Sequence, residues 1–266
     1  MDSPETSESA KGFAKPWVVK DKTGCWFYHC MDLPGESIET GTWDMRGRTS
    51  QYFGGVGLKG KSVLDVGTAS GFLAFEAEKA GASSVVGYDA YAGRIREMIP
   101  IRDYRQNKER YLRELDTGML SMKRGFWYSH GKLKSSVRAY YGSVYDIPED
   151  VGDFDVAIIG QILVHLKHPL SCIEQVAERV KPGGHLIITE GTFDSPEPVI
   201  RFLWTPNNRN QTYSWWHISE EFFRRFLSVL DFELVSKSKA PYRLKSQKDE
   251  WSEYELPTFV FRRMVV

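Results

Sequence analysis

Short apolar runs bounded by turns alternate with amphipathic segments along most of this chain. Runs of this length, rich in Val and Ile, are typical of buried strands in a parallel sheet. Five follow one another, at Ser62–Val66, Ser84–Tyr88, Val137–Tyr141, Phe154–Ile159 and Leu186–Glu190. Because helical patterns separate these runs, the sequence predicts an α/β fold with a parallel sheet covered by helices on both faces.

The segments between the strands show the apolar spacing of helices. The first helix begins after Gly71 and is stopped by Gly81. A charged stretch after the second strand predicts a helix over Arg94–Leu115 and a second helical or irregular piece over Thr117–Gly131, together a helical insertion at about 92–131. Three further helices are predicted at Ile162–Leu166, at Ser171–Val180 and after Ser219, whose hydroxyl suits an N-cap.

The remaining segments are less regular. Gly191–Trp216 reads as a long irregular connection, and Phe232–Ser236 and Thr258–Arg262 as sixth and seventh strands joined by a charged loop, Lys239–Glu255. Residues 1–15 are rich in Ser and Glu and predict a disordered tail. Residues 16–57 are dense in aromatic residues and glycines and form a candidate lid over a pocket, or a flap that serves only stability. The single domain then spans residues 58–266, with the insertion inside it.

Composition changes this picture little. The 35 basic and 35 acidic residues cancel, so the net charge gives no case for a nucleic-acid partner, although a local basic face remains compatible with it. Three cysteines are too few for a disulfide framework, and no His/Cys spacing suggests a metal site. No apolar window is long enough for a signal core or a membrane span. These features predict a cytoplasmic protein with no membrane partner and no metal.

Candidate chemistry begins in the turn after the first strand. Gly67 and Gly71 lie four residues apart behind Asp65, and Asp89 ends the second strand. Glycines at these positions allow positive φ angles and a close approach of the backbone to a ligand. A carboxylate at the end of the second strand can accept hydrogen bonds from both hydroxyls of a ribose. The pattern therefore indicates a nucleoside site, although it differs from the dinucleotide fingerprint G-x-G-x-x-G.

The acidic-x-Gly-x-x-x-Gly pattern resembles the first motif of class I S-adenosylmethionine-dependent methyltransferases. The block Asp153–Asp155, the segment Leu163–Leu166 and the turn Lys181–Gly184 follow in the order of that class. The resemblance implies a Rossmann-like, mostly parallel sheet of seven strands with an antiparallel last strand, and S-adenosylmethionine as cofactor. The cofactor-binding residues it implies are Asp65, Gly67, Thr68, Ala69, Gly71, Asp89, Ala90, Ser143, Val144, Tyr145 and Gly160.

A narrower resemblance covers most of the chain. Trp26–His29, Gly41–Arg46 and Ser143–Ile147, with Leu163–Leu166, are similar to the tRNA wobble-uridine (5-carboxymethoxyuridine) methyltransferase-like family. The tRNA-modifying members carry a long N-terminal extension and a Lys before the first strand that holds a carboxylated cofactor. Trp26–Met31 offers no such Lys, which favours ordinary methyl transfer. Many class I enzymes also place an Asp where this chain has Ser143, so Ser143–Tyr145 must form the adenine environment differently.

Three histidines are candidate general bases: His29 in the candidate lid, His165 after the fourth strand and His217 in the late connection. Each could instead make a structural hydrogen bond or a contact without proton transfer. Aromatic side chains that could hold a planar acceptor lie in the same two regions, at Tyr28, Trp43, Tyr213, Trp215 and Trp216, where the Trp pair could equally be core packing.

Three functions are compatible with these residues. The first is methyl transfer to nitrogen or oxygen of a small, aromatic, secondary-metabolite acceptor, as expected in natural-product biosynthesis. The second is RNA modification of the tRNA wobble-uridine type, which the family resemblance and the arginines of Arg94–Arg113 suggest. The third is a cofactor-binding regulator without catalysis. The sequence leaves the acceptor atom, single or repeated methylation and the oligomeric state open.

Overall fold

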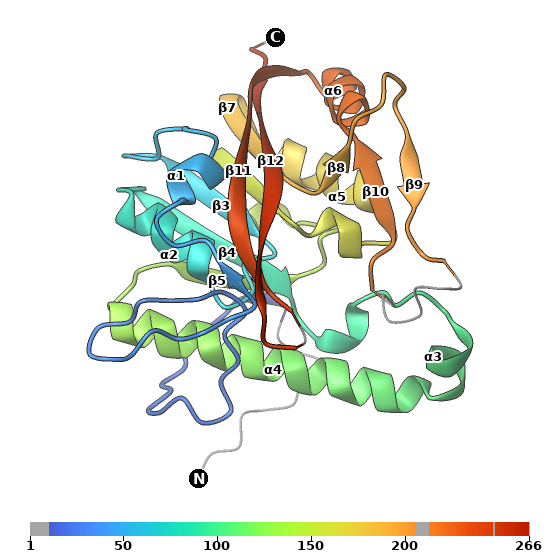
Figure 1. Cartoon of the computed structure of the whole chain (residues 1–266). Coiled ribbons are helices and arrows are strands. Elements are labelled where there is room, and N and C mark those ends of the chain that lie inside the picture. Colours follow the sequence, from blue (N-terminus) through green and yellow to red (C-terminus); the bar gives the residue numbers. More distant parts are fainter. Residues whose placement is uncertain (1–10, 206–212, 247, 266) are drawn as a thin grey trace.

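A nine-stranded sheet forms the centre of the computed structural model, which describes residues 11–205, 213–246 and 248–265 (Figure 1). The strand order is β1-β5-β4-β3-β6-β7-β12-β11-β2. Five parallel strands make up its middle: β3 (Ser62–Val66), β4 (Ser84–Ala90), β5 (Arg138–Gly142), β6 (Phe154–Gly160) and β7 (Val180–Thr189). The last strand, β12 (Trp251–Arg263), runs antiparallel to both β7 and β11 (Phe232–Lys245). The predicted seven-stranded sheet with an antiparallel last strand is confirmed.

Two short strands extend this sheet at its edges. They are β1 (Gly12–Phe13), which pairs with β5, and β2 (Trp43–Asp44), which pairs with β11. The helices are α1 (Thr49–Tyr52), α2 (Phe72–Lys79), α3 (Arg102–Gln106), α4 (Lys108–Leu133), α5 (Pro169–Glu178) and α6 (Glu220–Val229), with 3₁₀ turns η1 (Gly93–Ile95), η2 (Glu149–Val151) and η3 (Leu163–His165). Among the helices of the described ranges, none is long and apolar enough to cross a membrane.

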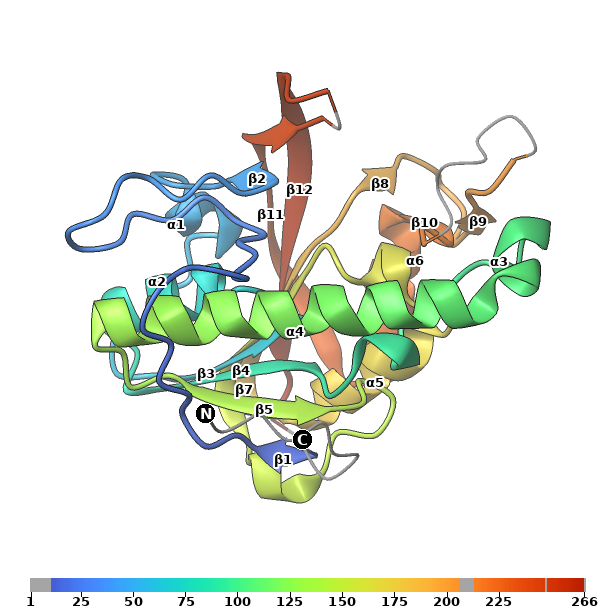
Figure 2. The same ribbon diagram turned by 90° about the horizontal axis from the view of Figure 1, so that it is seen from below.

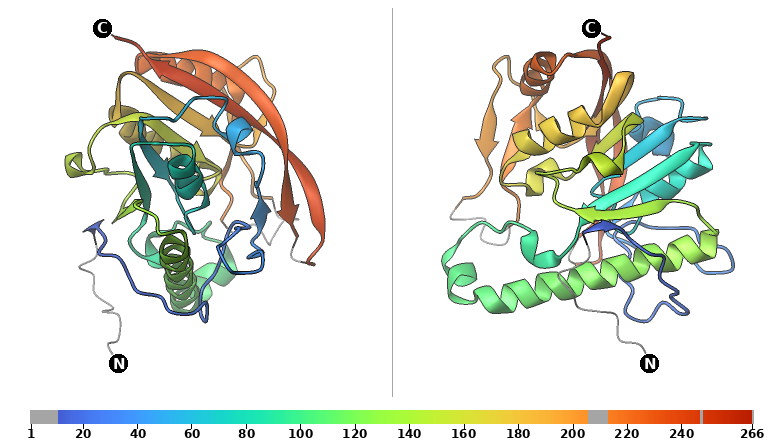
Figure 3. Two further views of the ribbon diagram at one scale, coloured as in Figure 1. Left: turned by 90° about the vertical axis from the view of Figure 1, so that its left-hand side faces the viewer. Right: turned by 180° about the vertical axis from the view of Figure 1, so that it is seen from behind.

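The strands bury both faces because the side chains of consecutive residues point to opposite sides of the sheet. In β3, Val63 belongs to the core that packs against α2 and α4, whereas Leu64 belongs to the core that packs against α5 and α6. Figure 3 shows the sheet between these two helical layers. Helix α6 begins as predicted, since the Ser219 hydroxyl accepts a hydrogen bond from the backbone N–H of Phe222 at 3.3 Å.

The charged stretch after β4 folds differently from the prediction. Arg94–Leu115 is not one helix, because η1, an extended connection and the short α3 precede α4. Pro100 lacks the N–H of a helix interior and keeps the preceding residue out of the helical region, which explains the break. Conversely, α4 runs without interruption through the point at which the sequence analysis divides it. The buried side chains of α4, which include Phe126 and Trp127, pack against the core. This tertiary packing stabilises the helix by more than its three glycines destabilise it.

Two segments predicted as loops contain strands. Within Gly191–Trp216 lie β8 (Thr192–Phe193) and β9 (Ile200–Phe202), which form a second, three-stranded sheet with β10 (Trp216–Ser219). The predicted loop Lys239–Glu255 is mostly hairpin, with β11 and β12 paired as far as Lys245 and Trp251. This hairpin extends beyond the rest of the sheet (Figure 2). Its charged, exposed positions concealed the pairing in the sequence.

The candidate lid packs on the domain as an irregular segment. Phe27, Met31 and Trp43 are buried in the same core as residues of α2 and α4, and the Trp26 backbone N–H donates to the carbonyl of Ser121 in α4 at 2.9 Å. The segment is thus fixed to α4 along the side on which the pocket described below lies. Of the predicted disordered tail, residues 1–10 lie outside the described residues, and Gly12–Phe13 form β1.

The contact between α4 and Trp26 gives a test of this packing. A Cβ added at Gly125 would lie 2.5 Å from the Trp26 carbonyl oxygen, whereas one at Gly118 in the same helix would lie 3.9 Å from the Trp26 ring. We expect Gly125→Ala to lower the free energy of unfolding by about 1–3 kcal/mol through overpacking. Gly118→Ala should raise it by about 0.5–1 kcal/mol through helix propensity. Urea denaturation measures both, and a Gly125→Ala variant as stable as wild type would contradict the packing.

Candidate functional site

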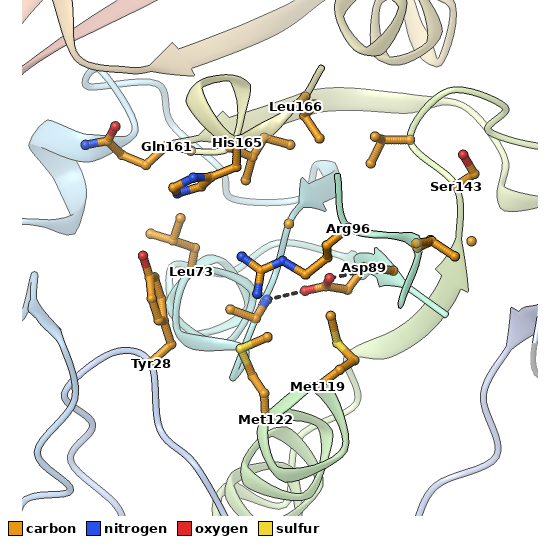
Figure 4. A pocket seen from close by; sticks show the side chains of 18 of the residues that line it. Tyr28, Leu73, Asp89, Arg96, Met119, Met122, Ser143, Gln161, His165 and Leu166 are labelled. Carbon is orange, nitrogen blue, oxygen red and sulfur yellow. Dashed lines mark hydrogen bonds between the residues drawn. The ribbon is translucent and has the colours of Figure 1, made fainter. Parts of the chain in front are cut away.

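A cavity of about 590 Å³ opens at the carboxyl ends of the parallel strands (Figure 4). Residues at the ends of β3, β4, β5 and β6 form its floor, and α4, the candidate lid and the η3 turn form its walls. The carboxyl edge is where ligands bind in open α/β sheets, because the strand order changes direction there. The volume lies within the range of small-molecule sites.

The turn after β3 brings backbone rather than side chains to the cavity. Gly67 and Gly71 have φ angles of 80° and 91°, and Ala69 has 52°. A Cβ on Gly67 would lie 2.3 Å from Cγ2 of Ile162, so only glycine fits between the β3 turn and the η3 region. Gly67 N–H donates to the Tyr88 carbonyl at 2.8 Å, which fixes this turn against the end of β4. The positive φ angles expected of both glycines are thereby confirmed.

Asp89 lies at the end of β4, with its carboxylate at the cavity floor. One oxygen accepts from the N–H of Ala69 at 2.7 Å and the other from the N–H of Ala90 at 2.7 Å. Burial raises the pKa of Asp89, and these two N–H donors oppose that shift. Each carboxylate oxygen can accept a further hydrogen bond from a ligand in the cavity, as the binding of both hydroxyls of a vicinal diol requires.

Three of the proposed cofactor residues lie behind the cavity wall rather than on it. Asp65, Thr68 and Gly71 are not among the lining residues, and Asp65 is 1% exposed. Burial raises the pKa of Asp65 to about 7. The neighbouring Ser70 hydroxyl accepts from the N–H of Tyr28 at 3.0 Å and so ties the candidate lid to the glycine turn. These side chains therefore support the turn, and the backbone of Gly67 and Ala69 meets the cavity.

The other end of the cavity is formed by the turn after β5. Ser143, Val144 and Tyr145 all line it, as do Ala90 and Gly160 from the ends of β4 and β6. The Tyr88 hydroxyl donates to the Ser143 carbonyl at 2.9 Å, and the Tyr145 hydroxyl bonds to the Glu97 carboxylate. The structure thus brings the residues expected around adenine to one side of Asp89.

His165 projects into the cavity from the η3 turn. Its Nδ1 lies 2.9 Å from the carbonyl oxygen of Tyr213. A carbonyl can only accept, so in the neutral ring Nδ1 carries the proton and Nε2 carries the free lone pair. Burial lowers the pKa of His165 to about 4, with the charge of Arg96 as a smaller contribution in the same direction. The ring is therefore an uncharged imidazole with a proton-accepting nitrogen at neutral pH.

The η3 turn itself is anchored by a buried carboxyl group at the end of β7. Glu190 is 2% exposed and accepts from the backbone N–H of Leu163 at 2.9 Å. Burial raises its pKa to about 8, against the opposing effect of the backbone donors. Glu190 therefore fixes the backbone on which His165 stands, although it does not line the cavity.

The other two histidines occupy different environments. His29 lines the cavity, but burial lowers its pKa to about 3 and its Nδ1 has no partner among the described residues. His217 lies in β10 against Phe193, with ring centroids 5.2 Å apart, and is not a lining residue. The structure therefore brings His29 and His165 to one cavity and leaves His217 outside it.

The aromatic candidates divide in the same way. Tyr28 and Trp43 line the cavity. The late aromatic residues support it from outside: Trp215 donates through Nε1 to the Glu97 carbonyl at 2.9 Å, Trp216 to the Lys167 carbonyl at 3.1 Å, and Tyr213 holds His165. The side chain of Glu97, whose carboxylate also accepts from the Lys167 N–H at 2.9 Å, joins three segments at this corner.

Several cavity residues were not found by the sequence analysis. Arg96 and Glu97 belong to the stretch predicted as a helix, so their inward direction could not be foreseen. Gln161 follows β6 with a φ of 54°, and its side chain accepts from the N–H of Gly191 at 3.3 Å. Met119 and Met122 reach the cavity from α4. Of these residues only Gln161 carried a signal in the sequence, its position directly after the end of a strand.

A parallel sheet of this order, with a glycine turn after its first core strand and an acidic residue ending the next, defines the Rossmann-like methyltransferase fold. Residues 45–237 match the family described as methyltransferase domain. The match covers more than half of the chain, which belongs to this family. The class is that of S-adenosylmethionine-dependent methyltransferases, and S-adenosylmethionine is its cofactor.

Similar proteins include a ribosomal protein L11 methyltransferase from Deinococcus radiodurans, which is 31% identical over 63% of this chain and 52% of its own length. A tRNA U34 carboxymethyltransferase from Alteromonas mediterranea is 24% identical over 67% of this chain and 46% of its own. The chain thus spans about half the length of these relatives. A SAM-dependent methyltransferase structure from Methanosarcina mazei shares the fold, with a TM-score of 0.51 and 16% identity over 84% of this chain and 100% of that one.

Proposed function

We propose that this domain transfers a methyl group from S-adenosylmethionine to nitrogen or oxygen of a small aromatic acceptor. One observation carries the proposal. A single cavity of about 590 Å³ is lined by a carboxylate placed to bind a ribose, by a neutral His165 and by aromatic side chains. Tyr28 and Trp43 offer flat apolar surface to a planar acceptor, and Met119 and Met122 offer adaptable surface.

The residues present fit the cofactor. Asp89 can accept from the ribose hydroxyls, and the Ser143–Tyr145 turn can surround the adenine. Gly67 leaves space that any Cβ would close. When bound, the cofactor supplies an activated methyl group on a sulfonium. The chain supplies orientation and water exclusion, which are the main protein contributions to such a displacement.

Proton removal from the acceptor falls to His165. Its Nδ1–H is held by the Tyr213 carbonyl, so Nε2 is the atom that accepts the proton of an O–H or N–H group. Glu190 keeps the η3 backbone in place beneath it. A base positioned in this way contributes about 10²–10⁴ in rate. The proton passes from the acceptor's nucleophilic atom to Nε2 of His165 as that atom takes up the methyl group, and S-adenosylhomocysteine is the other product.

The charge distribution favours a small acceptor over RNA. Two of the arginines that suggested an RNA face are paired with carboxylates: Arg94 lies 2.6 Å from Asp116, and Arg110 lies 3.4 Å from Asp103. A phosphate-binding surface requires cations that are free for phosphates. RNA is the alternative acceptor class, because one similar protein is a tRNA U34 carboxymethyltransferase.

A turnover experiment tests the proposal. Wild-type protein is incubated with methyl-labelled S-adenosylmethionine and, separately, with a panel of phenols and heteroaromatic amines or with bulk tRNA. We expect label in at least one small acceptor, and none in tRNA. Labelled tRNA would favour the RNA alternative. Tight cofactor binding without label in any acceptor would favour a non-catalytic role.

A further inference from the structure

Arg96 is a cation inside the cavity that the proposed reaction does not use. It follows η1 and lines the cavity, and Figure 4 shows its guanidinium directed into the space between Asp89 and His165. Among the described residues its guanidinium has no hydrogen bond or ion pair within the usual distances. An Arg side chain that offers five donors in a pocket and finds no partner marks a place for a ligand's acceptor group.

The neighbouring carboxylates are already engaged. Asp89 accepts from two backbone N–H groups, and Glu97, next to Arg96 in sequence, bonds to Tyr145 and to the Lys167 N–H. The positive charge of Arg96 acts on several groups around the cavity. Burial is the largest cause of the pKa shifts of Asp89, Tyr28 and His165, and the charge of Arg96 lowers the pKa of all three. The guanidinium therefore stands centrally among the lining groups.

The cofactor makes this positive charge harder to accommodate. The sulfonium adds another cation in the same cavity, and two unit charges in a water-poor site repel each other. An anionic group on the second ligand would relieve that repulsion and complete the hydrogen bonding of Arg96.

We propose that Arg96 binds a carboxylate of the acceptor, so that the acceptor class is an aromatic or heteroaromatic acid. The inference rests on the proposed function and specifies its substrate. The cofactor also carries a carboxylate, on its methionine part, and the experiment must separate the two sources. A planar carboxylate matches the guanidinium fork in a bidentate arrangement, which Lys cannot reproduce.

The test uses pairs of probes that differ only in charge: benzoate and benzamide, 4-hydroxybenzoate and 4-hydroxybenzamide, indole-3-acetate and indole-3-acetamide. Each is titrated calorimetrically into wild-type, Arg96→Met and Arg96→Lys protein saturated with S-adenosylhomocysteine. We expect at least one acid to bind wild type about tenfold or more tightly than its amide. Arg96→Met should lose that preference and Arg96→Lys should keep part of it.

Titration of S-adenosylhomocysteine and of 5′-methylthioadenosine, which lacks the amino-acid part, completes the design. The inference requires both nucleosides to bind Arg96→Met within about twofold of wild type. If Arg96→Met weakens only S-adenosylhomocysteine, Arg96 holds the cofactor's carboxylate and the inference is overturned. It is equally overturned if no acid binds wild type better than its amide, or if the preference survives in Arg96→Met. Failure of wild type to bind either nucleoside would instead overturn the proposed function, and the acceptor assignment with it.

Discussion

Asp89→Ala is expected to weaken the binding of S-adenosylhomocysteine by roughly 30- to 1,000-fold. The Asp89 carboxylate lies on the cavity floor at the end of β4, and its oxygens lie 2.7 Å from the Ala69 and Ala90 N–H groups that orient them. Hydrogen bonds to a charged group contribute about 1.5–3 kcal/mol each, so losing the two ribose contacts should cost about 2–4 kcal/mol after partial replacement by water. Isothermal titration measures the change in Kd.

A matched control separates this role from general damage to the nucleoside turn. Asp65→Asn changes the other carboxyl group of the motif, which is buried behind the wall and has a pKa raised to about 7. Because asparagine has nearly the size and shape of aspartate and Asp65 does not line the cavity, Asp65→Asn should leave the Kd within a few-fold of wild type. Equal losses in the two variants would mean that Asp89 acts only through folding. Thermal unfolding of both variants checks that they are folded.

His165→Asn is expected to lower kcat by about 10²–10⁴ on whichever small acceptor the turnover panel identifies. Asparagine can still donate to the Tyr213 carbonyl as Nδ1 does, but it removes the Nε2 lone pair. The affinity for S-adenosylhomocysteine should stay within about twofold. His217→Asn, outside the cavity, is the matched control and should leave kcat nearly unchanged. A His165→Asn variant with wild-type kcat would exclude proton transfer by this ring.

The same ring predicts the pH dependence of kcat. The pKa of His165 is lowered to about 4, so the imidazole is already neutral at pH 6 and stays neutral as the pH rises. The kcat should therefore be level between pH 8 and pH 6 and fall only below about pH 5. A base with the ordinary imidazole pKa of about 6.5 would lose roughly three quarters of its neutral form over that range. A fall of that size would contradict the assigned environment.

The part of the fold that the sequence determines locally was predicted well. β3, α2 and β4 follow from a short apolar run, a glycine turn and a helical spacing that lie next to one another in the chain, and Gly67 and Asp89 occupy the expected places. These elements depend on residues that are neighbours in the sequence. A backbone position with a positive φ angle can be recognised there because it favours glycine.

The missed features depend on partners far away in the sequence. The β11–β12 hairpin is charged and exposed along its outer part, so its pairing does not appear as an apolar pattern. The length of α4 depends on packing against residues such as Phe75 and Trp17. Pro100 breaks the predicted helix after Arg96 and Glu97, and the Glu97 carboxylate is held by Tyr145 and by the Lys167 N–H, which are distant in sequence. The grouping of His165 with Arg96 is thus a tertiary property.

The most direct test of the central claim, that this cavity is a methyltransferase active site, is a crystal structure of the wild-type protein with S-adenosylhomocysteine. We predict the ribose hydroxyls on the Asp89 carboxylate, the adenine within the Ser143–Tyr145 turn and the sulfur in the part of the cavity that His165 and Tyr28 line. A nucleoside bound away from Asp89, or with its sulfur on the side opposite to His165, would contradict the account.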